Sequence, residues 1–184
     1  MIKPWKKLKS QTYEHSPFRK IEDVLFEMPD GRQQTYALKK EGDAACVFAL
    51  TADQRVVLAR QFRPGPNEIV DELPGGAVND GETFKEAATR ELREETGYTP
   101  QEIFSIGSVL DCAYSTIRRQ VFVAIGCQKT ANQQLDMNEY IEVVLKQIPE
   151  FITQLVHGAC TDPEAAWMSL YHLGVISTTV ETDE

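Results

Sequence analysis

Three glutamates stand close together near the middle of the chain, Glu91, Glu94 and Glu95, and carboxylates at this spacing are suited to metal chemistry. If the segment is helical, successive residues turn by about 100°, so Glu91 and Glu95 share one stripe of the helix. Phe84 and Ala88 lie on that same stripe, and Glu94 lies at its margin. Like charges placed in this way repel one another, and burial makes the repulsion more costly. Two interpretations follow: the stripe opens onto a cleft where a divalent cation such as Mg²⁺ or Mn²⁺ sits, or it is a solvated acidic face.

Local sequence signals around these glutamates predict a helix over residues 84–96. Thr83 is a favourable N-cap residue, and Glu86, three residues later, completes a capping box. Gly97 follows the last periodic position, where a residue with left-handed backbone commonly ends a helix. The carboxylates are therefore expected in the last turns of a well-defined helix.

The segments around this helix are predicted to form a mixed sheet with few further helices. Alternation of polar and apolar residues predicts strands over residues 4–40, with Pro29-Asp30-Gly31 as a turn between two of them. Further strands are predicted at 45–50, 54–62, 102–113, 120–127 and 139–145, and further helices at 147–156 and 162–173. This pattern predicts an α+β or α/β sandwich and not a doubly wound fold.

Length and charge limit the classes of function. With 184 residues, the chain is long enough for one domain with a sizeable core. Its net charge of −9 argues against binding nucleic acid through the phosphates. A divalent metal would still supply the local positive charge that a phosphate-bearing small molecule requires.

The termini and the cysteines point to a cytoplasmic protein. We find no signal peptide and no apolar run long enough to cross a membrane. The four cysteines are far apart, with no C-x-x-C pair, so zinc ligation and a disulfide framework are not expected. We interpret them as small core residues in a reducing cytoplasm.

The wider spacing around the glutamates resembles a known motif. Residues 76–98 match the Nudix box, G-x5-E-x7-R-E-U-x-E-E-x-G-U, where U is a bulky apolar residue. Every specified position is filled, by Gly76, Glu82, Arg90, Glu91, Leu92, Glu94, Glu95, Gly97 and Tyr98. The resemblance implies a Nudix α/β/α sandwich with a mixed sheet, and hydrolysis of a nucleoside diphosphate linked to another group.

The resemblance also implies which residues bind metal. Glu91 and Glu95 would bind the catalytic metals, Glu94 would assist them, and the carbonyl of Gly75 would be a further ligand. The expected ion is Mg²⁺, with Mn²⁺ as the other possibility. Metals that bridge the diphosphate oxygens neutralise charge, activate a water and stabilise the leaving phosphate.

Supporting residues and a general base are implied in the same way. Arg90 would orient the carboxylates, and Glu82 would support the unit formed by the loop and the helix. The base, or a further metal ligand, would be an acidic residue on a mobile loop before the last strand, where Glu139 is the best match and Asp136 the next. Such a carboxylate would accept a proton from the attacking water, and the alternative is a solvated loop acid.

Flanking segments resemble the Nudix subfamily that cleaves ADP-ribose and nucleotide sugars. They are PWKKLKSQTY near the start, RQFRPGPNEIVDELPGG before the box and NEYIEVV after it. In that subfamily the N-terminal strands pair across a homodimer and each active site uses both subunits. We therefore expect residues 1–42 to serve dimerisation and residues 43–184 to form the Nudix hydrolase domain.

Two residues in these segments match substrate contacts of the subfamily. Trp5 is implied to stack on the base, and the alternative is an aromatic residue that only packs at the dimer interface. Arg63 is implied to contact the phosphates, for which a guanidinium is well suited, and the alternative is a surface salt bridge.

One loop departs from the subfamily pattern. Members that cleave ADP-ribose usually carry a proline after the box, whereas here the loop reads DCAYSTIRRQ, with Tyr114 near that place. Arg118 and Arg119 add positive charge, which would contact the substrate or, alternatively, the partner subunit or the acidic surface. Because this loop is implied to help select the terminal sugar, ADP-ribose and other nucleotide sugars such as GDP-mannose are both open.

The sequence thus predicts a Mg²⁺-dependent nucleotide-sugar pyrophosphatase that releases a nucleoside monophosphate and a sugar phosphate. One alternative is a Nudix hydrolase of dinucleoside polyphosphates or of damaged nucleotides, against which the N-terminal extension argues. Another is a sensor that binds nucleotide sugars without cleaving them, against which the complete set of box glutamates argues.

Overall fold

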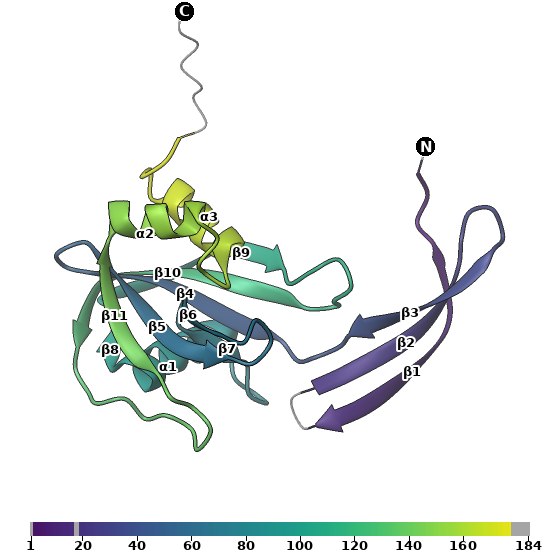
Figure 1. The fold of residues 1–184 in the computed structure, drawn as a ribbon, viewed down its shortest axis with the longest axis horizontal. Helices are drawn as coiled ribbons and strands as arrows, with labels where there is room; N and C mark the ends of the chain where they lie inside the picture. The colour runs from purple at the N-terminus through teal and green to yellow at the C-terminus, as the bar shows by residue number, and fades with distance from the viewer. Residues whose placement is uncertain (1, 17–18, 178–184) are drawn as a thin grey trace, which may run out of the picture. The chain divides into compact units, whose positions relative to one another are not determined.

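The computed structural model describes residues 2–16 and 19–177 and divides the chain into two compact units (Figure 1). Unit 1 comprises Met1–Asp43 together with Leu110–Arg119. Unit 2 comprises Ala44–Val109 together with Gln120–Glu184. The first unit therefore contains an internal segment of the chain in addition to the N-terminal strands.

Unit 1 is built on a three-stranded antiparallel sheet in the order β1-β2-β3. Its strands are β1 (Lys6–Ser16), β2 (Arg19–Glu27) and β3 (Gln33–Lys39). The predicted turn between β2 and β3 is present, and Gly31 adopts the left-handed backbone, with φ +84°, that this turn requires. Every residue of β1 is exposed, whereas Val24 in the central strand is fully buried.

The internal segment of unit 1 is joined to the last residue of β3. The backbone N–H of Lys39 donates to the carbonyl of Tyr114 (2.8 Å), and the N–H of Thr116 donates to the carbonyl of Lys39 (2.9 Å). The ammonium of Lys39 lies 3.1 Å from the carboxylate of Asp111. The rings of Tyr36 and Tyr114 stack with centroids 6.3 Å apart. Residues 110–119 thus extend the N-terminal sheet through backbone, ionic and aromatic contacts.

Unit 2 contains an eight-stranded sheet in which β11-β5-β4-β10-β8 form the main path, while β6 pairs with β5, β7 with β4 and β9 with β10. Its strands are β4 (Ala44–Thr51), β5 (Arg55–Arg63), β6 (Glu68–Glu72), β7 (Gly75–Ala77), β8 (Tyr98–Thr99), β9 (Glu102–Leu110), β10 (Arg118–Lys129) and β11 (Glu142–Gln147). The helices are α1 (Phe84–Thr96), α2 (Ile148–Val156) and α3 (Pro163–His172). All three predicted helices are present, but the short strands β6, β7 and β8 were not predicted.

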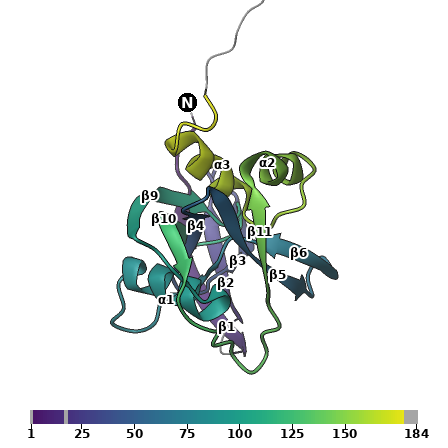
Figure 2. The ribbon, with the colours of Figure 1, turned by 90° about the vertical axis from the view of Figure 1, so that its left-hand side faces the viewer.

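Helices cover both faces of this sheet, with α1 on one face and α2 and α3 on the other (Figures 1 and 2). Ala88 and Leu92 of α1 pack with Val47 and Val57 of the sheet in one buried cluster. A second buried cluster on the opposite face includes Phe151 of α2 and Leu170 of α3. The alternation of β4 and β5 side chains between these clusters gives the predicted sandwich of helices around a mixed sheet.

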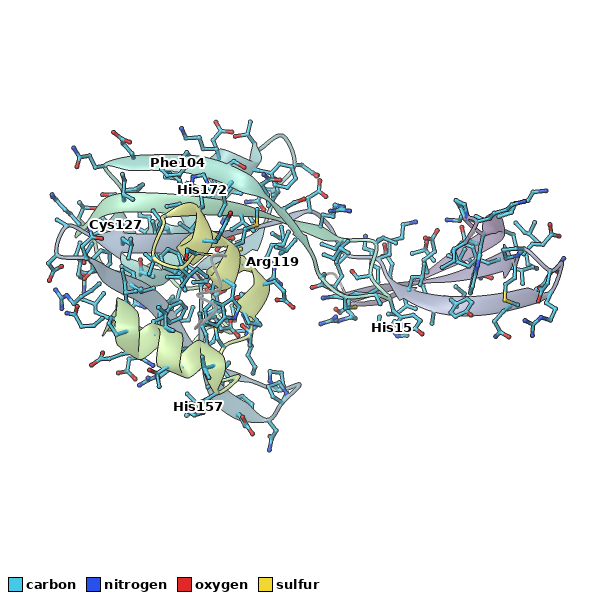
Figure 3. The ribbon with its side chains drawn as sticks, turned by 90° about the horizontal axis from the view of Figure 1, so that it is seen from above. His15, Phe104, Arg119, Cys127, His157 and His172 are labelled. Atoms are coloured by element: carbon cyan, nitrogen blue, oxygen red, sulfur yellow. The ribbon has the colours of Figure 1, made fainter. Side chains whose placement is uncertain are left out.

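The last helix is tied to the sheet by an aromatic contact at its end. The ring centroids of His172 and Phe104 in β9 lie 5.6 Å apart, and both residues are labelled in Figure 3. Among the described residues, none of the helices is both long and apolar enough to span a bilayer.

Helix α1 has the ends that the sequence predicted. The hydroxyl of Thr83 accepts from the backbone N–H of Glu86 (3.2 Å), and the Glu86 carboxylate accepts from the backbone N–H of Thr83 (2.9 Å). At the other end Gly97, with φ +75°, donates its N–H to the carbonyl of Arg93 (2.8 Å). The caps fix the two ends of the helix, and the packing of Ala88 and Leu92 against the sheet fixes which side chains turn inward.

Candidate active site

The three box glutamates differ in burial as the helical phase requires. Glu95 is only 4% exposed and packs toward the sheet, on the stripe that also carries the fully buried Ala88. Glu91 is mostly buried, and Glu94, at the margin of the stripe, is more accessible than either. A solvated acidic face therefore describes Glu94 at most, and α1 does turn carboxylates toward the interior.

Glu95 is held by the strand that precedes the box. Its Oε2 accepts from the backbone N–H of Gly75 in β7 (2.9 Å). Burial, together with the carboxylates of Glu91, Glu139 and Glu72, raises the pKa of Glu95 to about 8 against the effect of this hydrogen bond. Burial and neighbouring carboxylates therefore disfavour the ionised form of Glu95.

Glu91 lies against the glycine that opens the box. A Cβ on Gly76 would collide with the Glu91 carboxylate, so only glycine at this position leaves room for it. Burial raises the pKa of Glu91, as does repulsion from Glu94 and Glu139, whereas the hydrogen bond from Arg90 acts in the opposite direction. The small size of Gly76 in β7 thus leaves space for the carboxylate of Glu91 in α1.

Arg90 connects the supporting residues of the box. Its Nε and Nη2 donate to the two oxygens of Glu82 (2.8 and 3.0 Å), and Nη2 also donates to the carbonyl of Ala77 (3.0 Å). Its Nη1 donates to Glu91 (2.8 Å) and Glu94 (3.0 Å). One guanidinium therefore fixes the loop before α1 and two of its carboxylates.

A carboxylate that the sequence did not single out lies beside these groups. Glu72, in β6 and only 4% exposed, accepts from Nε and Nη2 of Arg63 (2.7 and 2.5 Å) and from the amide of Gln61 (3.1 Å). The charges of Glu95 and Glu139 also act on Arg63. Arg63 does form an ion pair, as one sequence interpretation proposed, but with a buried partner. The available signal was an acidic residue at an inward position of a strand.

The loop before β11 contributes the predicted base. Glu139 and Asp136 form a small turn, in which the Glu139 carboxylate accepts from the Asp136 N–H and the Glu139 N–H donates to the Asp136 carbonyl (both 3.0 Å). Asp136 is exposed, whereas Glu139 is half-buried and its charge raises the pKa values of Glu91 and Glu95. The charge of Glu139 therefore interacts with the carboxylates of Glu91 and Glu95.

The other two predicted substrate contacts, Trp5 and Arg118, belong to unit 1. Trp5 is half-exposed, and its ring centroid lies 6.3 Å from that of Phe26 and 5.6 Å from that of Tyr36. Arg118 is exposed at the start of β10. Trp5 therefore lies in an aromatic cluster with Phe26 and Tyr36, and Arg118 lies in the internal segment of unit 1.

Arg119, the neighbour of Arg118, is labelled in Figure 3 and lies 3.7 Å from Asp111. Both residues belong to the internal segment of unit 1. Arg119 therefore has an acidic neighbour within its own loop.

A cavity of about 880 Å³ lies along the loop before α1 and the outer side of the helix. Glu82, Arg90 and Glu94 line it, but Glu91 and Glu95 do not. The cavity is therefore behind the supporting residues rather than over the buried carboxylates.

The donor set of the site was compared with the needs of a divalent cation. Within residues 2–16 and 19–177, no three acidic, histidine or cysteine side chains are already gathered in the arrangement of a metal site. The four carboxylates of Glu72, Glu91, Glu95 and Glu139 nevertheless share one electrostatic field with the guanidinium of Arg63. Hard oxygen donors with excess negative charge fit Mg²⁺ or Mn²⁺ in chemistry and in charge.

Comparison with known proteins extends this description. The NUDIX domain family matches residues 40–173. The ADP-ribose pyrophosphatase of Bacillus subtilis (strain 168) is 30% identical over 153 residues, which cover 82% of each chain. The methanol dehydrogenase activator of Bacillus methanolicus is 28% identical over 126 residues, which cover 67% of each chain.

A solved structure supports the architecture. The crystal structure of an ADP compounds hydrolase superimposes with a TM-score of 0.75 and covers 96% of this chain and 99% of that one. At 18% sequence identity this likeness concerns the fold alone, and it confirms the predicted α+β architecture.

Proposed function

The chain belongs to the Nudix family and is a pyrophosphatase of that family, and we propose that it hydrolyses the diphosphate bond of a nucleoside diphosphate sugar. The products would be a nucleoside monophosphate and a sugar phosphate. ADP-ribose is the first substrate to test, because the Bacillus subtilis relative is an ADP-ribose pyrophosphatase.

One observation carries this proposal: the mostly buried carboxylates of the site outnumber its two guanidinium groups, those of Arg63 and Arg90. Glu95 and Glu91 have raised pKa values because burial and neighbouring carboxylates disfavour their charged forms. Such an arrangement is costly for an empty protein interior. It is favourable where divalent cations and a diphosphate bind together and restore the balance of charge.

We propose that Glu91, Glu95 and the carbonyl of Gly75 hold the divalent metal, Mg²⁺ or Mn²⁺. The metal would supply neutralisation of the diphosphate oxygens and acidification of a water. Arg90, anchored on Glu82, would keep Glu91 in the orientation needed for ligation. The N–H of Gly75 already orients Glu95.

The remaining roles concern proton transfer and substrate binding. Glu94 would assist the ligands, since Arg90 already holds its carboxylate beside that of Glu91. Glu139 would accept the proton of the attacking water. Arg63 would contact the phosphates, while Trp5 would stack on the base and Arg118 would contact the terminal sugar side of the substrate.

We further propose that the active form is a homodimer in the cytoplasm, assembled through the N-terminal strands. Edge strand β1 is exposed along its whole length, and an unpaired strand edge is a template for pairing with another chain. Within the described residues none of the four cysteines forms a disulfide, which fits a reducing compartment. Elution as a monomer in size-exclusion chromatography with light scattering would contradict the dimer.

A substrate panel tests the proposed reaction. ADP-ribose, GDP-mannose, UDP-glucose and diadenosine polyphosphates would each be incubated with the protein and Mg²⁺, and nucleoside monophosphate release would be measured. Fastest turnover of a nucleotide sugar is the expected result. Preference for diadenosine polyphosphates would favour the other type of Nudix hydrolase, and binding without turnover would indicate a sensor.

A further inference from the structure

Adjacent residues of β6 point to opposite faces of the sheet, and both are acidic. Asp71 lies on the face covered by α2 and α3, where it is bound by Arg60 and Lys146. Glu72 lies on the face covered by α1, where it is bound by Arg63 and Gln61. Both carboxylates are 4% exposed, so burial alone does not distinguish them.

The contact between Glu72 and Arg63 uses one edge of the guanidinium. Nε donates to one carboxylate oxygen and Nη2 to the other, which is the bidentate geometry that fixes the plane of an arginine. Nη1 takes no part in this contact, and the Arg63 side chain is 45% exposed. The second edge of the guanidinium is therefore accessible while the first is anchored.

The orientation of Arg63 does not follow from strand pairing alone. In the register of the hairpin, Arg63 lies opposite Glu68, yet its side chain reaches diagonally to Glu72. The amide of Gln61 donates to Oε2 of Glu72, the oxygen that also accepts from Nη2 of Arg63, and so fixes the carboxylate from a second direction. The charges of Glu95 and Glu139 also act on the guanidinium, so Arg63 is electrostatically coupled to the acidic residues of the site.

We propose that Glu72 is a positioning residue for substrate binding, which holds Arg63 so that its free edge receives the diphosphate. This inference rests on the proposed function, because it assigns a partner to the phosphate-binding arginine. An arginine side chain has many rotamers, and an arginine that is already oriented loses less conformational freedom when it binds a phosphate. Gln61 contributes by fixing the second carboxylate oxygen.

The first test is Glu72→Gln, which keeps the size of the side chain but removes its charge. Arg63 contacts phosphates in both the ground state and the transition state, so KM for ADP-ribose should rise about tenfold while kcat changes little. The dissociation constant for ADP with Mg²⁺, measured by calorimetry, should increase by a similar factor. The matched control is Asp71→Asn, the neighbouring buried acid on the other face, which should leave both KM and the ADP affinity unchanged.

A double-mutant cycle separates positioning from a general structural effect. Arg63→Ala should itself weaken ADP binding, and adding Glu72→Gln to Arg63→Ala should have no further effect, because Glu72 acts through Arg63. If Glu72→Gln does not fold, Arg63→Lys replaces it, since lysine keeps the charge without a second anchored edge. Arg63→Lys should then raise KM by a similar factor.

Several results would overturn the inference. They are an unchanged KM and ADP affinity in Glu72→Gln, an unchanged KM in Arg63→Lys, or full additivity of the two substitutions in the cycle. The proposed function fails separately if the wild-type protein turns over no nucleotide sugar. In that case the ADP affinities of the variants still decide whether Glu72 positions Arg63.

Discussion

Asp71 and Glu72 are neighbours in strand β6, are equally buried and lie on opposite faces of one sheet. The charged groups around them differ. Burial raises the pKa of Asp71, but hydrogen bonds from Arg60 and Lys146 outweigh it and hold that pKa below its ordinary value. On the other face, Glu72 shares one guanidinium with a group of further carboxylates, among them Glu95, whose pKa is raised to about 8.

The difference in neighbouring charges distinguishes a structural ion cluster around Asp71 from a candidate active site around Glu72. Asp71 itself is bound by two cations, Arg60 and Lys146, and α2 is tied to this cluster through the Lys146 contact with Gln154. Around Glu72, the charges of Glu95 and Glu139 also act on its partner Arg63, and a divalent cation would relieve this excess of negative charge. The sign and the balance of charge, rather than burial, therefore mark the functional face.

The largest effect is expected from replacing Glu95, a buried acid on the face of the sheet that α1 covers. Glu95→Gln should lower kcat for ADP-ribose about a thousandfold, because the amide is a poor metal ligand in a place where charge is required. The thermal unfolding temperature should not fall, since the substitution removes a buried charge. Glu94→Gln serves as the less buried comparison, and activity of Glu95→Gln within a few-fold of wild type would contradict the metal assignment.

The second prediction concerns pH in metal-free protein. The pKa of Glu95 is higher in the folded state, about 8 against an ordinary 4.5, so its contribution to stability is complete below pH 4.5 and is lost as pH rises toward 8. Between pH 5 and 7.5 this group should lower the free energy of unfolding by about 3 kcal/mol. Urea denaturation with EDTA measures it, and Glu95→Gln should flatten the dependence.

Addition of Mg²⁺ sharpens the same measurement. A cation that binds the ionised carboxylates should restore stability most at the high end of this pH range. Equal pH slopes in wild type and Glu95→Gln would show that Glu95 does not carry the effect.

The third prediction concerns Asp71, on the face of the sheet that α2 and α3 cover. Asp71→Asn leaves Arg60 and Lys146 without their carboxylate, and it should lower the free energy of unfolding by about 2 kcal/mol, less than for fully buried pairs because both cations are partly exposed. Activity should be unchanged. A loss of activity without a loss of stability would reverse the assignment of the two faces.

The smallest predicted effect concerns the space for Glu91. Gly76→Ala places a methyl group against the Glu91 carboxylate, which has to move, and kcat should fall about tenfold with little loss of stability. Gly81→Ala lies in the loop between β7 and α1, where φ is +80° but no atom is close, and it tests backbone strain alone. Equal effects of the two substitutions on kcat would contradict a steric role for Gly76.

Local sequence signals were sufficient to predict one part of the site. Helix α1 was predicted to the residue because its signals are local: Thr83 and Glu86 form the capping box, and Gly97 ends the helix. The phase of Glu91 and Glu95 then follows from helical geometry.

The missing part of the site was the contact between Glu72 and Arg63. It depends on the register of the β5–β6 hairpin and on a diagonal reach across it, neither of which is encoded in a local signal. The membership of residues 110–119 in unit 1 was missed for a related reason. The bonds between Lys39 and Thr116 join residues that are 77 positions apart.

The joining of β3 to residues 110–119 has a consequence for chimeric proteins. The family match begins at residue 40, so a natural junction for exchanging N-terminal strands between relatives would fall beside Lys39. Such an exchange would bring a foreign strand to Tyr114 and Thr116, whose backbone partners are the N–H and carbonyl of Lys39. The transplantable module is therefore discontinuous, and residues 1–43 and 110–119 have to be exchanged together.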